Sequence, residues 1–150
     1  MSCSWLIFVF LSCRMIKKEF RLKGKDINYL VKKRNYFTYE IFGVYYIPQY
    51  PNRLYNQFSV NIGLWVSKSA AVRHLLKRVV MRYVSDHKLQ EKKFGSWYYK
   101  CFVMVHKAQM PAVQKLIATM ERKAIQDVVH ERAVQFFTRL YQRLWVSSVK

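Results

Sequence analysis

The sequence predicts an α/β fold, a two-layer α+β sandwich in which helices pack on a central mixed sheet of about three or four strands. Three observations predict it. Residues 57–66 (QFSVNIGLWV) alternate between apolar and mostly small or polar side chains, which is typical of a strand with one buried face. Residues 72–83 carry apolar side chains at helical spacing. From Pro111 to Trp145 no further Gly or Pro interrupts a helical pattern, and 150 residues that are 52% hydrophobic suffice for one domain with its own core.

The expected order of elements is helix, strand, strand, helix, strand, helix. Residues 26–33 (DINYLVKK) predict a short helix, because Asp26 can cap its N-terminus and apolar residues follow at i, i+3 and i+4. Residues 38–47 (TYEIFGVYYI) are β-branched and aromatic, with apolar residues on both faces, which indicates one strand buried on both sides. Two strands before the middle helix, and the lack of a GxGxxG or P-loop motif, argue against a doubly wound nucleotide-binding fold.

The remaining elements follow from the same patterns. The middle helix is predicted from Ser67 to His87, and a third strand at residues 97–105 (WYYKCFVMV). A long helix is predicted from Pro111 to Trp145, and a break near 130–133 would divide it into two. In the alternating strand, one face is expected to be core and the other is small and polar apart from Trp65. The predicted core face consists of Phe58, Val60, Ile62, Leu64 and Val66.

Residues 15–146 are expected to form the single domain, between an N-terminal extension (1–14) and a tail (147–150). The apolar run at residues 5–11 is shorter than the roughly 20 residues that span a bilayer. No basic residue precedes it, which argues against a signal peptide. We interpret Met15 as the true start, with residues 1–14 as upstream sequence. The alternative is a membrane anchor at residues 5–11 beside basic residues.

Charge is the unusual feature of the composition. The chain has 27 Lys and Arg against 8 Asp and Glu, a net charge of +19, which predicts a polyanionic partner, either nucleic acid or an anionic membrane surface. The three cysteines (Cys3, Cys13 and Cys101) have no metal-binding spacing, which indicates reduced thiols and a cytoplasmic location.

The helix at residues 72–83 has two unlike sides. Its basic side carries Arg73, His74, Lys77, Arg78 and Arg82, opposite an apolar arc. Like charges four residues apart repel, and phosphates on that side would relieve the repulsion. We interpret this side as nucleic-acid binding. A solvated surface and a membrane-binding face are the alternatives.

Acidic residues are few and dispersed, so no catalytic residue and no metal site are expected in the protein. The one suggestive set is Asp127, His130 and Glu131, at i, i+3 and i+4 on a predicted helix. A metal site is one interpretation of this set, and an exposed amphipathic face is the preferred one.

The segment VSK…AAVRHLLKRVVMR resembles the signature of the protein subunit of bacterial ribonuclease P: a strand ending in S-K-K, a short loop and a helix beginning A-V-x-R-N-R-x-K-R. Residues 66–68 match the strand end, and Ala70, Arg73, Lys77 and Arg78 match the helix. FRLKGKDINYLVKKRNYF is similar to the family's R-L-K-x-x-x-D-F-x-x-V-F-K-x-G, FSVNIGLWVSK to its R-x-G-I-x-V-S-K-K, and the strand ending in CFVMV lies where the family has D-I-V-V-I-A-R. The resemblance covers about Met15 to Leu140.

The sequence also departs from the family pattern. His74 stands where the family has Asn, Leu75 where it has the second Arg, and Ser69 where it has the second Lys. Ile27 and Val31 replace two aromatic positions of the first helix. The resemblance is therefore to a divergent member.

The resemblance implies a ribonuclease P protein-like fold and a role in removing the 5′ leader of precursor tRNA. The RNA subunit would carry the chemistry and its magnesium ions, so the protein would be an accessory subunit whose partners are ribonuclease P RNA and precursor tRNA, without stable membrane association. A ribosomal or general RNA-binding protein without a role in cleavage is the alternative.

The implied sites fall into three groups. The basic helix and its loop would dock on the catalytic RNA through Lys68, Arg73, His74, Lys77, Arg78 and Arg82. The leader would bind in a cleft between the sheet and the first helix, at Ile27, Val31, Tyr45 and Trp65. Further basic contacts are expected from Arg21, Lys23 and Lys25. Packing beneath the C-terminal helix is the alternative for Trp65.

Overall fold

A computed structural model describes residues 18–149 of the chain. At its centre lies a four-stranded sheet with the strand order β1-β2-β4-β3. The strands are β1 (Tyr36–Tyr39), β2 (Phe42–Pro48), β3 (Gln57–Asn61) and β4 (Tyr99–Val105). β2 pairs antiparallel with both β1 and β4, whereas β3 pairs parallel with β4. The predicted fold class, an α/β fold on a mixed sheet, is confirmed.

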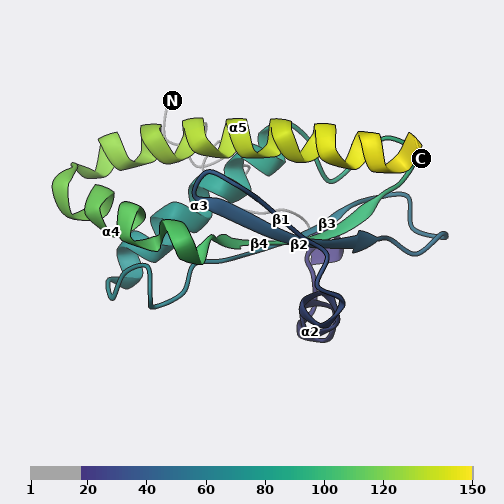
Figure 1. Ribbon diagram of the computed structural model, residues 1–150, viewed down its shortest axis with the longest axis horizontal. Helices are drawn as coiled ribbons and strands as arrows, with labels where there is room; N and C mark the ends of the chain where they lie inside the picture. Colours follow the sequence, from purple (N-terminus) through teal and green to yellow (C-terminus); the bar gives the residue numbers. More distant parts are fainter. Residues whose placement is uncertain (1–17, 150) are drawn as a thin grey trace, which may run out of the picture.

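Helices lie on both faces of this sheet (Figure 1). The helices are α2 (Gly24–Lys33), α3 (Ala70–Asp86), α4 (Met110–Thr119) and α5 (Arg122–Val149), with short 3-10 helices at Lys18–Phe20 and Lys107–Gln109. α5 runs along one side of the sheet and α2 stands on the other (Figure 1). α3 packs with α5, so two long helices cover one face and one short helix covers part of the other.

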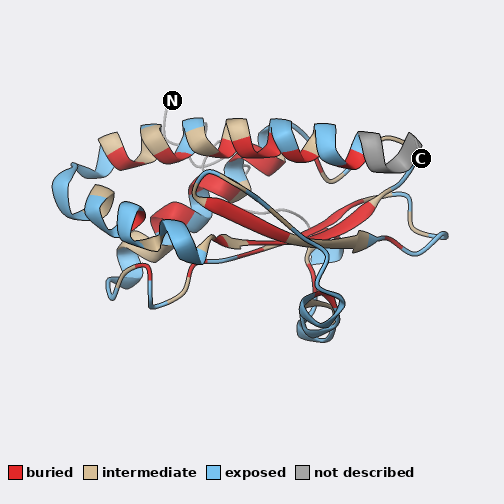
Figure 2. Ribbon diagram, in the orientation of Figure 1, coloured by how far each residue is buried: buried red, intermediate tan, exposed pale blue. Residues whose placement is uncertain are grey.

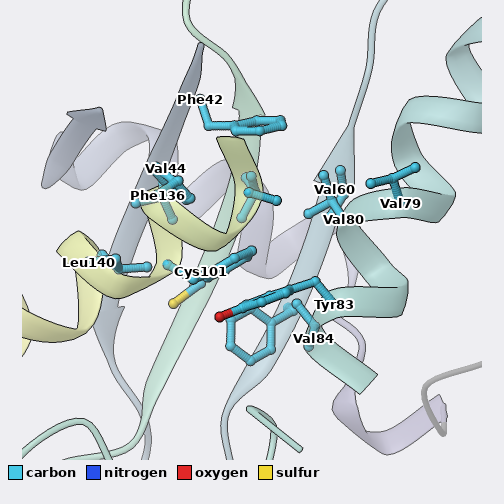
Figure 3. Packing of buried hydrophobic residues seen from close by; sticks show 14 of the residues in the cluster. Phe42, Val44, Val60, Val79, Val80, Tyr83, Val84, Cys101, Phe136 and Leu140 are labelled. Atoms are coloured by element: carbon cyan, nitrogen blue, oxygen red, sulfur yellow. The ribbon is translucent and has the colours of Figure 1, made fainter. Parts of the chain in front are cut away.

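The main core lies between the sheet and the pair α3 and α5. Side chains of alternate strand residues point into it and meet the apolar sides of both helices (Figure 3). The buried residues labelled there are Phe42, Val44, Val60, Val79, Val80, Tyr83, Val84, Cys101, Phe136 and Leu140. Each large apolar side chain buried in this way contributes about 1.5–3 kcal/mol relative to exposure. Figure 2 shows the result as buried stripes on α3 and α5 that face the sheet.

The single strand predicted at residues 38–47 is wrong, because the segment is a hairpin. Tyr39 pairs with Phe42, and Glu40 and Ile41 form the two-residue turn between β1 and β2. Glu40 adopts a left-handed backbone with φ of 56°, a conformation that sequence patterns assign to Gly, Asn or Asp. The turn therefore carries no conventional sequence signal.

The strand predicted at residues 57–66 is shorter than expected. β3 ends at Asn61, and the chain then turns, with the Val66 N–H donating to the Gly63 carbonyl at 3.1 Å. Phe58, Val60, Ile62 and Val66 are buried as predicted, but Leu64 is 67% exposed. The alternation of apolar and polar residues in the sequence continues past the end of β3, into the loop where Leu64 lies. The assignment of Leu64 to the core is therefore wrong.

The C-terminal helical region divides at Met120 and Glu121, not near residues 130–133. Met120 has an extended backbone, with φ of −113° and ψ of 152°, and ends α4. α5 runs unbroken through residues 130–133, where Val129 and Ala133 are buried in the core, and it continues to Val149, beyond the predicted end at Trp145. The N-terminal extension (1–14) and its apolar run lie outside the described residues.

Candidate nucleic-acid interface

The exposed side of α3 carries a row of cations. The helix begins after Ser69, whose side-chain oxygen accepts a hydrogen bond from the Val72 N–H at 3.4 Å. Its apolar arc is buried against the sheet and α5, as the sequence predicts. The opposite side is exposed and presents His74, Lys77, Arg78 and Arg82, which we name the α3 ridge.

The α3 ridge has no acidic partner among residues 18–149. Salt bridges join Lys100 to Asp26 and Arg132 to Glu40, both outside α3. None of the four ridge side chains forms a salt bridge among the described residues, so the α3 ridge is a basic surface. Such a surface can neutralise phosphates and release their counterions.

Arg73, predicted to bind RNA, is held by the protein itself. Its Nη1 donates to the Ser67 carbonyl at 3.0 Å and to the Lys68 carbonyl at 3.3 Å. The guanidinium thereby fixes the loop that carries the exposed Lys68 beside the start of α3. Lys68 and the α3 ridge consequently lie in adjacent segments of one surface.

The face of the sheet that α2 covers holds a smaller apolar cluster. Leu22, Leu30 and Phe102 are its buried members, and Ile27 and Tyr45 pack against them with part of their surface exposed. Two predicted leader-binding residues, one from α2 and one from β2, thus come together in this cluster.

Tyr36 of β1 adds a second ring beside Tyr45. The ring centroids lie 4.6 Å apart, and the Tyr36 side chain crosses above Gly43, where a Cβ atom would overlap its hydroxyl. Burial raises the pKa of Tyr36 above its ordinary value of 10.0, and the neighbouring Tyr45 adds to the rise. Flat rings on a sheet face provide a stacking platform for unpaired bases.

A buried ion pair fastens α2 to the sheet. The prediction that Asp26 caps α2 is wrong: the capping position is Lys23, whose side chain makes no capping hydrogen bond. The Asp26 carboxylate instead accepts a hydrogen bond from Lys100 Nζ of β4 at 3.0 Å. Lys100 is only 2% exposed, so the contact with Asp26 offsets part of the cost of burying its polar end.

A pocket of about 340 Å³ opens beside the start of α2. It gathers the three predicted basic contacts Arg21, Lys23 and Lys25 into one place. Its other lining residues are Lys18, Glu19, Asp26, Tyr50, Arg53, Tyr55 and Gln57, so five cations face two acids. We name this the basic pocket.

The other two predicted leader-binding residues, Val31 and Trp65, do not belong to the apolar cluster of Leu22, Leu30 and Phe102. Val31 is on α2 but exposed. Trp65 is 80% exposed on the loop between β3 and α3, where its carbonyl accepts a hydrogen bond from Gln114 of α4 at 2.5 Å. The ring is therefore not packed beneath the C-terminal helix, and its role in leader binding stays a prediction.

The suggestive acidic set is on the surface of α5. Asp127, His130 and Glu131 are all exposed, and the His130 ring lies 6.1 Å from the Tyr83 ring. Within residues 18–149, no group of three His, Cys, Asp or Glu side chains is placed to hold a metal ion. Among the same residues, no helix has the length and apolar character that crossing a membrane requires.

Comparison with solved structures identifies the architecture. The RNase P protein from Thermotoga maritima aligns over 74% of this chain and 96% of its own, with a TM-score of 0.52 and 15% identity. The RNase P protein of Staphylococcus aureus aligns over 75% of this chain and 91% of its own, with a TM-score of 0.53 and 18% identity. This chain has the RNase P protein fold. No protein-family model and no curated protein sequence matches it, so the likeness lies in the structure.

Three residues that the structure places at the candidate site of this RNase P protein fold were not predicted from the sequence. Tyr36 was missed because the hairpin was taken for one strand. Lys100 lies in an apolar strand, where a lysine indicates a buried partner. That partner, Asp26, was not predicted because it lies 74 residues away in the sequence. Tyr50 was assigned only to a loop by its flanking prolines.

Proposed function

We propose that this protein is the protein subunit of a ribonuclease P and assists removal of the 5′ leader from precursor tRNA. The observation that carries the proposal is the α3 ridge, because it is an unpaired cationic surface on the helix that joins β3 to β4 in an RNase P protein fold. In this proposal the α3 ridge and Lys68 neutralise phosphates of the catalytic RNA.

The leader is proposed to bind on the opposite face of the sheet. Single-stranded RNA needs cations for its phosphates and flat rings for its bases. The Tyr36–Tyr45 pair supplies rings beside α2, and the basic pocket supplies cations at the start of the same helix. The RNA subunit supplies the hydrolytic chemistry and its magnesium ions, and this chain binds and orients the substrate. The proposal places the protein in the cytoplasm, without stable membrane association.

The test is cleavage of a leader-bearing precursor tRNA by the cognate ribonuclease P RNA at low magnesium, with and without this protein. The variant Lys77→Ala/Arg78→Ala/Arg82→Ala removes three ridge cations. The matched control, Lys115→Ala/Arg122→Ala/Lys123→Ala, removes three exposed cations from α4 and α5. We expect stimulation to be lost in the ridge variant and kept in the control. The salt dependence of RNA binding should also fall by about 2–3 in logarithmic slope, at about 0.7–0.9 per lost phosphate contact.

Two results would contradict the proposal. Tight RNA binding without any stimulation of cleavage would leave a ribosomal or general RNA-binding protein on the same fold. Equal loss of stimulation in both variants would show that net charge, rather than the α3 ridge, is responsible.

A further inference from the structure

A second pocket adjoins the basic pocket at the loop between β2 and β3. It measures about 170 Å³ and is lined by that loop and by the turn before β4. Its lining residues are Gln49, Tyr50, Pro51, Arg53, Leu54, Lys93, Ser96, Trp97 and Tyr98, among which there is no acid. Tyr50 and Arg53 line both pockets and therefore stand at their junction. We name the second one the Trp97 pocket.

Tyr50 is a half-exposed ring flanked by two cations. Lys100 Nζ lies 4.0 Å from the ring centroid and the Arg53 guanidinium carbon 5.1 Å from it. Lys100 is itself fixed by Asp26, so one side of the ring is held in place. The ring remains 52% exposed and available to a ligand.

Trp97 is displayed by a tight turn. Phe94 and Trp97 exchange backbone hydrogen bonds at 3.1 and 3.5 Å, and Gly95 between them has a φ of 71°, a left-handed conformation that suits glycine. Phe94 is buried in the core, whereas Trp97 is 51% exposed. The turn thus anchors one aromatic residue and presents the other.

Buried amide side chains hold the walls of the Trp97 pocket. Gln49 donates to the Tyr55 carbonyl and to Gln57 Oε1, both at 3.2 Å. Asn56 donates to the Leu89 carbonyl at 2.6 Å, and its Oδ1 accepts from the Tyr99 N–H at 2.7 Å. These bonds tie the loop to β4 and to the segment after α3. The pocket therefore exists before any ligand arrives, which lowers the entropy cost of binding.

Size and chemistry together select the ligand. At about 170 Å³ the Trp97 pocket is below the roughly 300 Å³ of ordinary small-molecule sites, so it suits one ring rather than a whole cofactor. Exposed aromatic rings next to Arg53 and Lys93, without an acid in the lining, match a base attached to a phosphate. The adjoining basic pocket would take the neighbouring phosphates of the same strand.

We propose that the basic pocket and the Trp97 pocket form one binding site for single-stranded RNA, which is separate from the α3 ridge and extends beyond the Tyr36–Tyr45 pair. Phosphates lie among the cations of the basic pocket, the strand passes Tyr50, and one base stacks on Trp97. Only the source of this RNA rests on the proposed function: it is either the far part of a leader or a single-stranded segment of the RNA subunit.

The test measures the affinity of a labelled single-stranded RNA oligonucleotide by fluorescence anisotropy. Trp97→Ala should weaken binding between about fivefold and about a hundredfold, because one stacked base contributes about 1–3 kcal/mol. Tyr50→Ala should also weaken binding, because it removes the ring that the strand passes between the two pockets. Trp97→Phe should restore most of the affinity. Trp145→Ala is the matched control, since Trp145 is 48% exposed but lines neither pocket, and it should leave the affinity unchanged.

An abasic oligonucleotide isolates stacking from charge. It should bind the unaltered protein at least as weakly as the intact oligonucleotide binds Trp97→Ala, and it should lose nothing further on that variant. Unchanged affinity in both Trp97→Ala and Tyr50→Ala would overturn the proposal. Equal competition by an acidic peptide would also overturn it, because the site would then recognise charge alone.

Two further arms identify the source of the RNA. If Trp97→Ala weakens binding of long-leader precursors but not of short-leader precursors, the ligand is the leader. If it weakens binding of the isolated RNA subunit, the ligand is that RNA. Failure of the proposed function would instead appear as absent stimulation of cleavage, with oligonucleotide binding still sensitive to Trp97.

Discussion

The two faces of the sheet differ in how completely they are covered. The face toward α3 and α5 contributes nearly all the buried apolar side chains of the described chain, whereas the face toward α2 has a cluster with three buried members (Figure 2). On that second face, rings and cations remain partly exposed. The comparison indicates that stability resides on one face and ligand contact on the other. Substitutions on the two faces should therefore change different measured quantities.

The largest expected effect is on the covered face. Phe136 of α5 is fully buried, and its ring lies 5.7 Å from Phe42 and 5.3 Å from Phe137. Phe136→Ala should lower the free energy of unfolding by about 3–5 kcal/mol, because it leaves a cavity among close-packed rings. Urea denaturation measures this change. Gln142→Ala on the exposed side of α5 is the control and should stay within about 0.5 kcal/mol.

The ion pair between α2 and β4 comes next. Asp26→Ala leaves Lys100 buried without its partner and should cost about 3 kcal/mol, the lower end for a broken buried pair because Asp26 keeps part of its surface in water. Lys100→Met in the same background should recover most of the loss. If the double variant were as unstable as Asp26→Ala, the buried charge would not be the cause.

Tyr45 and Tyr46 allow the sharpest comparison, because adjacent residues of β2 point to opposite faces. Tyr45→Leu should weaken leader binding by about 1–3 kcal/mol, the range for one stacked base, with little effect on unfolding. Tyr46→Leu should lower the unfolding free energy and leave the affinity unchanged, since Tyr46 packs against the main core. Anisotropy and urea denaturation of both variants measure this. Equal effects of the two on affinity would contradict the division between the faces.

The smallest expected effect is the absence of a reaction at Cys101. Burial raises the pKa of the Cys101 thiol far above its ordinary value of 9.0, and the thiolate is the reactive form. Cys101 should therefore resist iodoacetamide in the folded protein even at moderately alkaline pH and react once denaturant is added. Peptide mass spectrometry reports both states. Modification of Cys101 without denaturant would show that the covered face opens.

Sequence patterns predicted the elements whose signals are local. α3 and β4 follow from helical spacing and from an apolar run, and both appear within two or three residues of their expected ends. The hairpin did not follow, because its turn depends on a left-handed backbone at Glu40, a residue that rarely adopts it. The break at Met120 did not follow, because no Gly or Pro marks it in the sequence.

The candidate site was predictable where charge alone defines it. All four residues of the α3 ridge were predicted, since basic side chains on one side of a helix need no knowledge of the rest of the fold. The pairing of Asp26 with Lys100 and the meeting of two pockets at Tyr50 join segments far apart in the sequence. Such pairs require the strand order, which no local pattern contains.

The position of β4 has a consequence for synthesis on the ribosome. β4 is the last strand in the sequence, yet it lies between β2 and β3, and β3 pairs with no other strand of the described sheet. A growing chain can close the β1–β2 hairpin early, but β3 waits without a strand partner until residues 99–105 have left the exit tunnel. During that interval an apolar strand edge is open on a strongly basic nascent chain, and such edges are sites of misassembly. A chain terminated before Val105 should accordingly be recovered as aggregate rather than as a smaller folded protein.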